Sequence, residues 1–180
     1  MLKTLFKKKV NEDKLSNVLI NSLVHAMEVG FPDISAIIND DVDFIEKPNI
    51  KEDDYDKFLF ILFVGNLKIM NERLEPIQAN RIEELLKQKF SKIYGLEVSK
   101  INLYLKEYSK FIGRINYPSK NILYGMSKAI FFKYNLSQFQ EDYFKDLNTP
   151  NPVFLKRLNE IVKNFIWDWD CFLEKYNFVE

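Results

Sequence analysis

The side chains that most often perform covalent or metal chemistry are scarce in this sequence. His25 is the one histidine and Cys171 the one cysteine among 180 residues. A nucleophilic cysteine or serine needs a nearby base, usually a histidine, and no pattern brings His25 close to Cys171. A zinc site needs several histidine or cysteine ligands. The sequence therefore predicts no catalytic residue, no metal site and no bound cofactor, and we interpret His25 as structural.

Two other kinds of reactive site also lack their sequence patterns. Di-iron helical bundles carry Glu-x-x-His motifs, and this sequence has none. Nucleotide sites use glycine-rich loops whose backbone N–H groups hold phosphates, whereas the five glycines here are far apart. We therefore expect a protein that binds rather than catalyses, and we leave an enzyme of an unfamiliar type as an alternative.

The most unusual local composition is an acidic segment from Asp40 to Asp56, which has eight carboxylates, two lysines and a local charge of −6. Its carboxylates lack the spacing of a calcium loop. One interpretation is a solvated loop that leads into a helix, whose dipole favours negative charge at its start. The other is a surface that binds a basic region of a protein partner. The candidate residues for such a partner are Asp40, Asp41, Asp43, Asp53, Asp54 and Asp56.

Aromatic residues are abundant, with 16 Phe, 9 Tyr and 2 Trp. Helical bundles can bind small ligands in apolar pockets between their helices, with a few polar groups to orient them. An alternative function is therefore a small apolar-ligand binding protein, or an unfamiliar enzyme, with an aromatic pocket. The candidate polar groups of that pocket are Tyr104, Tyr108, Tyr124 and Tyr143.

Composition and charge narrow the class of protein. The 26 basic and 26 acidic residues cancel, so we expect no nucleic-acid partner, because such domains are usually basic. One cysteine allows no internal disulfide, and Met1–Val10 lacks the apolar core of a secretory signal. The longest apolar run, Phe58–Val64, has seven residues, whereas a membrane span needs ~20. We expect a cytoplasmic protein, and the abundance of Lys, Asn, Ile and Phe suggests an AT-rich bacterial genome.

Residues 1–10 are predicted to form a basic N-terminal tail, followed by a single helical domain over residues 11–180. The tail combines three apolar residues with lysines, and lysines near an anionic membrane each contribute roughly 1 kcal/mol. A peripheral membrane protein that acts through this tail is a further alternative, although a frayed terminus explains the same residues. The residues concerned are Leu2, Lys3, Leu5, Phe6, Lys7, Lys8 and Lys9.

Helical periodicity runs through almost the whole chain. It predicts an all-α, single-domain bundle of about seven or eight helices. The helix near residues 54–71 should be central, because Phe58–Val64 is apolar on every side; a buried strand is the alternative for those seven residues. Gly65 should let a neighbouring helix approach closely. The other predicted helices span residues 13–29, 33–39, 76–95, 100–115, 119–134, 137–147 and 152–176.

The last predicted helix supplies a second candidate surface. Asn151 fits an N-cap and Pro152 a first helical residue. If the helix continues to Tyr176, Trp167 and Cys171 lie on its polar side. Such a tryptophan packs against another element or binds a partner, because Trp is enriched among interface hot spots.

The leading hypothesis is therefore a non-enzymatic protein–protein interaction protein, such as an adaptor, an immunity-type inhibitor or an assembly factor. Its candidate surfaces are the acidic segment and the Trp167 side of the last helix, and the Trp167 side is also the candidate face for a homodimer.

Overall fold

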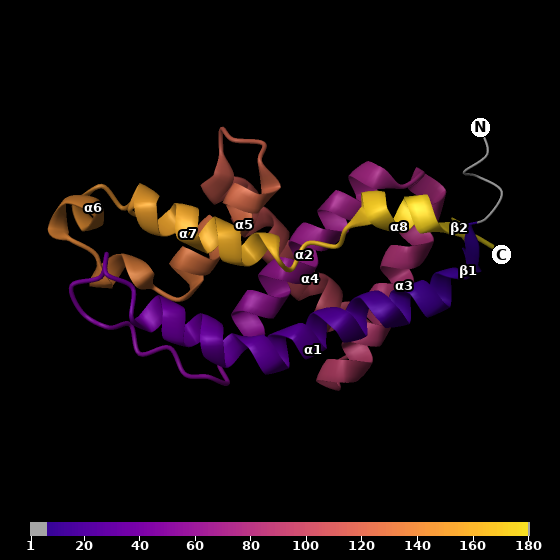
Figure 1. Ribbon diagram of the computed structural model, residues 1–180, viewed down its shortest axis with the longest axis horizontal. Coiled ribbons are helices and arrows are strands. Elements are labelled where there is room, and N and C mark those ends of the chain that lie inside the picture. Colours follow the sequence, from indigo (N-terminus) through magenta and orange to yellow (C-terminus); the bar gives the residue numbers. More distant parts are fainter. Residues whose placement is uncertain (1–6, 180) are drawn as a thin grey trace.

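The computed structural model describes residues 7–179, and this part of the chain is all-α (Figure 1). Eight α-helices alternate with loops, one 3-10 helix (η2) and two strands of three residues each. The elements are β1 (Lys8–Val10), α1 (Glu12–Asn39), α2 (Asp56–Arg73), α3 (Pro76–Tyr94), α4 (Val98–Asn116), α5 (Ile122–Lys133), η2 (Leu136–Phe139), α6 (Asp142–Asp146), α7 (Pro152–Lys163), α8 (Trp169–Lys175) and β2 (Tyr176–Phe178). The predicted all-α fold class is confirmed.

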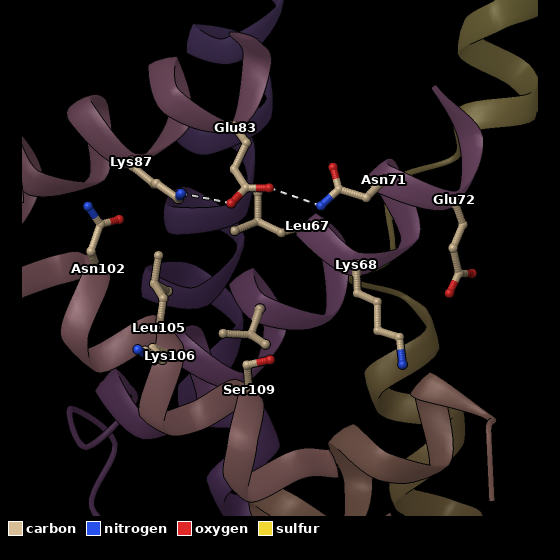
Figure 2. Close-up of a pocket in the computed structure, with 11 residues that line it drawn as sticks. Leu67, Lys68, Asn71, Glu72, Glu83, Lys87, Asn102, Leu105, Lys106 and Ser109 are labelled. Atoms are coloured by element: carbon tan, nitrogen blue, oxygen red, sulfur yellow. Dashed lines mark hydrogen bonds and ion pairs between the residues drawn. The ribbon is translucent and has the colours of Figure 1, made fainter. Parts of the chain in front are cut away.

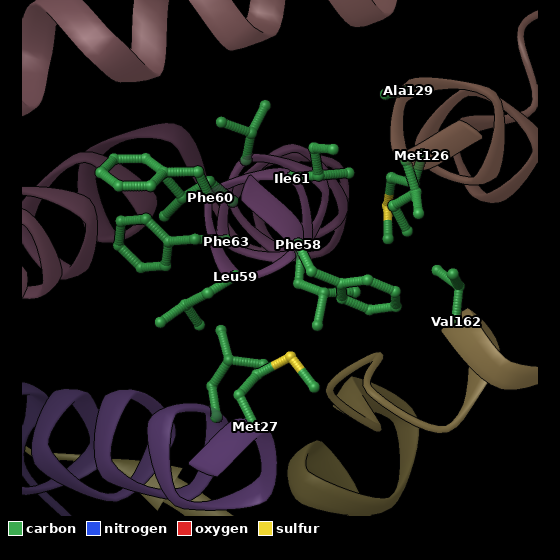
Figure 3. Close-up of a cluster of buried hydrophobic side chains, with 14 of the residues drawn as sticks. Met27, Phe58, Leu59, Phe60, Ile61, Phe63, Met126, Ala129 and Val162 are labelled. Atoms are coloured by element: carbon green, nitrogen blue, oxygen red, sulfur yellow. The ribbon is translucent and has the colours of Figure 1, made fainter. Parts of the chain in front are cut away.

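Helix α2 is the centre of the bundle, as its composition predicts. Every residue from Phe58 to Leu67 is buried, and α2 packs against α1, α3, α4 and α5. Figure 3 shows its side chains pointing outward in several directions toward these neighbours. A Cβ on Gly65 would lie 1.9 Å from Sδ of Met126. The missing side chain therefore lets α5 approach α2, as predicted.

Helix α1 is longer than its sequence pattern predicts. The predicted stop at Gly30 and the separate helix at residues 33–39 are wrong, because α1 continues through Pro32. Phe31 and Ile34 are both buried, and the ring of Phe31 packs edge-on against Phe58 of α2 with a centroid distance of 5.8 Å. Tertiary packing across the proline outweighs the local tendency to end the helix.

The segment between α5 and α7 differs from the predicted helix over residues 137–147. It forms η2 and the short helix α6, and the buried side chain of Gln140 connects the segment to the start of α7. Its Nε2 donates to the carbonyl of Thr149 at 3.1 Å, and its Oε1 accepts from the N–H of Asn151 at 2.6 Å. Asn151 is the N-cap and Pro152 the first residue of α7, as predicted.

The predicted continuous helix from residue 152 to residue 176 is also wrong. Helix α7 ends at Lys163 and α8 begins at Trp169. The side chain of Asn66, which is fully buried in α2, fills the break. Its Nδ2 donates to the carbonyl of Phe165 at 2.9 Å, and its Oδ1 accepts from the N–H of Trp167 at 2.8 Å. The hydrogen bonds that continue a helix are thus replaced by bonds to one side chain.

The two ends of the described part of the chain meet through β1 and β2, which pair in parallel with Lys8 opposite Tyr176. Residues 8–10 of the predicted tail are therefore ordered, while Leu2, Lys3, Leu5 and Phe6 lie outside the described residues. Lys7 donates through Nζ to the carbonyl of Leu173 at 2.5 Å. No helix of the described chain has the length and apolarity to cross a membrane.

Candidate functional site

A surface pocket of about 450 Å³ lies between α2, α3 and α4 (Figure 2). Its floor is apolar and is formed by Val64 and Leu67 of α2 and Leu105 of α4. These three side chains are 6–7 % exposed, so the floor belongs to the edge of the core. The volume falls within the range of small-ligand and side-chain pockets.

One side of the pocket rim is held by a network of hydrogen bonds and ion pairs. Glu83 accepts from Nζ of Lys87 at 2.8 Å and from Nδ2 of Asn71 at 2.9 Å, and Lys87 also pairs with Glu84 at 2.9 Å. Figure 2 shows Glu83 between its two partners. Burial lowers the pKa of Lys87, but the hydrogen bonds and charges of Glu83 and Glu84 outweigh burial and raise its pKa above the ordinary value. The side chains on this part of the rim are therefore held by bonds within the chain, and the charge of Lys87 is already paired.

The remaining charges of the rim are Lys68, Lys106 and Glu72. None of the three forms an ion pair within residues 7–179. Glu72 follows Lys68 by one helical turn on α2, and Lys106 faces the pocket from α4. The pocket thus combines an apolar floor with two ammonium groups and one carboxylate that form no ion pair in the described chain.

The pocket has no arrangement suited to covalent chemistry. Ser109 supplies the hydroxyl on its rim, and no histidine is among the residues that line the pocket. No group of three or more His, Cys, Asp or Glu among residues 7–179 is placed to hold a metal ion. The apolar floor and the two lysines beside it can bind a ligand that carries an apolar group next to a negatively charged one.

The acidic segment lies apart from this pocket, and most of its candidate residues already have partners in the chain. Arg157 of α7 donates to Asp41 at 2.9 and 2.5 Å and also to Asp43. The carboxylate of Asp41 is 5 % exposed.

The other four carboxylates are more accessible. Asp40 pairs with Lys47, Asp54 pairs with Lys57, and Asp56 accepts from the hydroxyl of Tyr94 at 2.8 Å. Asp53 is exposed and has no hydrogen bond or ion pair in the described chain. Only Asp56 is in the first turn of α2, and Asp53 and Asp54 precede the helix. Internal pairing thus removes much of the reason to expect a basic partner here.

Trp167 is not on the polar side of a helix, because it lies in the break between α7 and α8. Its ring is half-buried and packs edge-on against Trp169 at 6.2 Å. The indole Nε1 of each tryptophan is buried without a hydrogen-bond partner. Cys171 is half-buried in α8, and its N–H donates to Asp168 at 2.9 Å. The structure therefore makes Trp167 a packing residue.

The four candidate tyrosines do not share a pocket. Tyr108 stacks on Phe60 at 5.4 Å, and Tyr104 packs edge-on against the same ring at 5.9 Å. Tyr124 of α5 lies under the ammonium of Lys128 at 4.8 Å. Tyr143 of α6 is 67 % exposed. Tyr104 and Tyr108 therefore lie beside α2 at the edge of the core, whereas Tyr124 and Tyr143 lie on α5 and α6.

The fold is a helical bundle with a pocket on its surface. No protein-family model, no curated protein and no solved structure matches this chain.

Sequence reasoning missed the pocket residues, because their side chains come from three helices. The sequence contains only a weak signal that Lys106 could belong to a pocket. Lys106 lies four residues before Lys110 on the polar side of a clear amphipathic helix, which is the ordinary pattern of a solvated face.

Proposed function

We propose that the protein is a non-enzymatic protein–protein interaction protein whose pocket between α2, α3 and α4 binds an acidic segment of its partner. An adaptor, an immunity-type inhibitor and an assembly factor all work through such binding. The observation that carries the proposal is the apolar floor beside Lys68 and Lys106, two lysines without carboxylate partners.

The chemistry of the pocket defines the partner segment. An apolar side chain on Val64, Leu67 and Leu105 would remove apolar surface from water, which contributes roughly 25 cal/mol per Å². Carboxylates on either side of that side chain would pair with Lys68 and Lys106. Glu83, Lys87 and Asn71 are already bonded to one another, so few side chains on that side of the rim would lose conformational freedom on binding. A smaller loss of conformational entropy favours affinity.

Charge reversal tests the proposal in a capture experiment. A tagged Lys68→Glu/Lys106→Glu variant should capture the partner at least about tenfold less than the unmodified protein, because like charges across an interface cost several kcal/mol. A matched Lys156→Glu/Lys163→Glu variant changes two exposed lysines of α7 by the same charge and should capture normally. Equal capture by both variants would refute the assignment of the pocket.

A second variant blocks the pocket without changing its charge. Ser109 is exposed on the rim, so Ser109→Trp places a large ring over the apolar floor. We expect loss of capture with unchanged thermal unfolding, as measured by circular dichroism. Normal capture by Ser109→Trp would show that the partner contacts the lysines but not the pocket.

A further inference from the structure

Helix α4 has a hollow in the protein surface on each of its two sides. The pocket of the proposed function lies on the side toward α2 and α3, and Leu105 and Lys106 line it from α4. A groove of about 500 Å³ lies on the side toward α5, and Phe111, Arg114 and Ile115 line it from α4. A partner that fills both hollows must therefore cross the exposed face of α4.

The groove beside α5 has the same kind of chemistry as the pocket. Its apolar part is formed by Phe111 and Ile115 of α4 and Phe132 of α5, and its cations are Arg114 and Lys133. The other two residues that line it are asparagines, and no carboxylate is among the described residues of its lining. An apolar group next to an acidic one therefore fits the groove as it fits the pocket.

An aromatic ring, rather than a carboxylate, positions the two cations of the groove. The guanidinium of Arg114 and the ammonium of Lys133 lie 5.6 and 5.0 Å from the centre of the Phe111 ring. Within residues 7–179 neither cation forms an ion pair. Both charges are therefore held beside the groove and remain open to an acidic group.

A row of cations on α4 connects the pocket to the groove. Lys106, Lys110 and Arg114, which we call the basic stripe, follow one another at intervals of one helical turn, and all three are exposed. Lys106 lines the pocket and Arg114 lines the groove, so Lys110 lies between them. Glu107 is the one acidic residue of α4, and the next carboxylate along the chain is Glu141. The exposed face of α4 is therefore mainly basic from one hollow to the other.

We propose that the acidic segment of the partner continues from the pocket across the basic stripe and places a second apolar side chain in the groove beside α5. The inference rests on the proposed function, because the same segment begins in the pocket. The partner segment thus has two apolar residues with Asp or Glu between and beside them. Its carboxylates pair with Lys110 and Arg114 as well as with the lysines of the pocket.

The geometry of α4 sets the spacing of the two apolar residues. The rise from Lys106 to Arg114 is about 12 Å, and a helix with its side chains is about 10 Å wide, so the diagonal is roughly 16 Å. An extended chain covers ~3.3 Å per residue. The two apolar residues of an extended partner segment are therefore about five positions apart.

A single-stranded nucleic acid fits this surface less well than an acidic protein segment. Such nucleic acids are bound largely by the stacking of bases on open aromatic rings. The Phe111 ring of the groove already lies under Arg114 and Lys133, and the floor of the pocket is aliphatic. Neither hollow therefore offers an open aromatic face for a base.

The test uses random peptides of about 16 residues, selected by display on the unmodified protein. The selected peptides should carry two apolar residues about five positions apart, with Asp or Glu between them. Arg114→Glu should bind these peptides at least about tenfold more weakly, because it places like charges across the interface. Lys163→Glu, the same change at an exposed lysine of α7, should bind them normally. Unchanged thermal unfolding of both variants would show that they are folded.

Shortened peptides separate the groove from the pocket without relying on a variant. The full peptide should shift the NMR methyl signals of both Leu105 and Ile115 in the unmodified protein. A peptide cut to the apolar residue that binds in the pocket, with its flanking acids, should shift Leu105 alone. Arg114→Glu should weaken this short peptide by less than about threefold, because exposed charges about 12 Å apart are largely screened at physiological salt.

The outcomes distinguish failure of this inference from failure of the proposed function. Peptides that Lys68→Glu/Lys106→Glu weakens but Arg114→Glu does not, and that leave Ile115 unshifted, would overturn the second site and keep the pocket. Peptides that bind all variants equally would overturn both proposals. Binding of a labelled oligothymidylate that Arg114→Glu abolishes, without selection of acidic peptides, would overturn the inference in favour of a nucleic-acid site.

Discussion

Oδ1 of Asn66 accepts a hydrogen bond of 2.8 Å from the backbone N–H of Trp167, 101 residues further along the chain. Nδ2 of the same side chain donates to the carbonyls of Leu62 and Phe165 at 3.0 and 2.9 Å. One buried amide thus satisfies backbone groups where α7 ends. Because buried polar groups without partners are costly, Asn66 determines where α8 departs from α7.

Replacing Asn66 should therefore destabilise the fold. Asn66→Ala leaves the carbonyl of Phe165 and the N–H of Trp167 buried without this partner, and we expect the free energy of unfolding to fall by about 2–4 kcal/mol. Urea denaturation measures the change. Asn164→Ala is the matched control, because Asn164 is exposed and bonds only within its own helix; it should change stability by less than about 0.5 kcal/mol.

Gly65→Ala tests the close approach of α2 and α5. The added methyl group would overlap Sδ of Met126, and overpacking of this kind costs about 1–3 kcal/mol. Gly113→Ala adds the same methyl group to α4 in open space and should stabilise the protein by about 0.5–1 kcal/mol. If thermal unfolding showed the same change for both variants, the contact between Gly65 and Met126 would not be a tight one.

Arg157→Gln tests whether α7 holds the acidic segment. Removal of the guanidinium leaves the buried carboxylate of Asp41 without its cation, and we expect a loss of about 2 kcal/mol in urea denaturation. Hydrogen exchange should also rise at Ile50 of this segment, whose N–H donates at 2.8 Å to Oδ1 of Asn39, the last residue of α1. Arg73→Gln breaks an exposed ion pair with Asp170 and should cost less than about 1 kcal/mol.

Tyr94, which is partly buried, and Tyr134, which is buried, predict a loss of stability at alkaline pH. Burial, followed by the hydrogen bond to Asp56, raises the pKa of Tyr94 above its ordinary value of 10.0. Burial, followed by the charge of Asp54, raises the pKa of Tyr134 in the same direction. Above pH 10 the unfolded chain loses these protons while the folded chain keeps them, so stability falls as pH rises.

The alkaline effect can be measured residue by residue. Each tyrosine contributes a fall of about 1.4 kcal/mol per pH unit above pH 10 until its folded form also ionises. Urea denaturation between pH 8 and pH 11 should show this slope, and Tyr94→Phe should make it shallower. Tyr117→Phe, a change of an exposed tyrosine, should leave the slope unchanged; a slope that Tyr94→Phe does not alter would contradict the raised pKa of this hydroxyl.

Local signals in the sequence predicted the parts of the fold that depend on neighbouring residues. The apolar run of α2 predicted the central helix, and Asn151 with Pro152 predicted the start of α7. Gly65 predicted a close helix contact, because a glycine within an apolar helix leaves space for a neighbouring helix to approach. These features could be predicted because each depends on residue type and short-range spacing.

The rest of the fold depends on contacts between distant residues. The break after Lys163 depends on Asn66, and a periodic pattern across residues 152–176 contains no sign of it. The continuation of α1 through Pro32 depends on packing of Phe31 against Phe58. The pairing of Asp41 with Arg157, across 116 residues, turns a predicted open acidic surface into one that is partly neutralised.

The candidate pocket also depends on contacts between residues that are far apart in the sequence. Lys68 and Lys106 lie on different helices, and each has the sequence pattern of a solvated charge. Only the packing of α2 against α3 and α4 brings both lysines to the rim of one apolar floor. The sequence thus predicted a binding protein in general terms but not the surface that we propose.

Peptide display against the purified protein is the measurement that tests the pocket most directly. Peptides selected on the unmodified protein should carry an apolar residue flanked by Asp or Glu, and they should bind the Lys68→Glu/Lys106→Glu variant at least about tenfold more weakly. They should also shift the NMR methyl signals of Leu67 and Leu105. Selection of basic peptides, or of peptides that bind both proteins equally, would contradict the account.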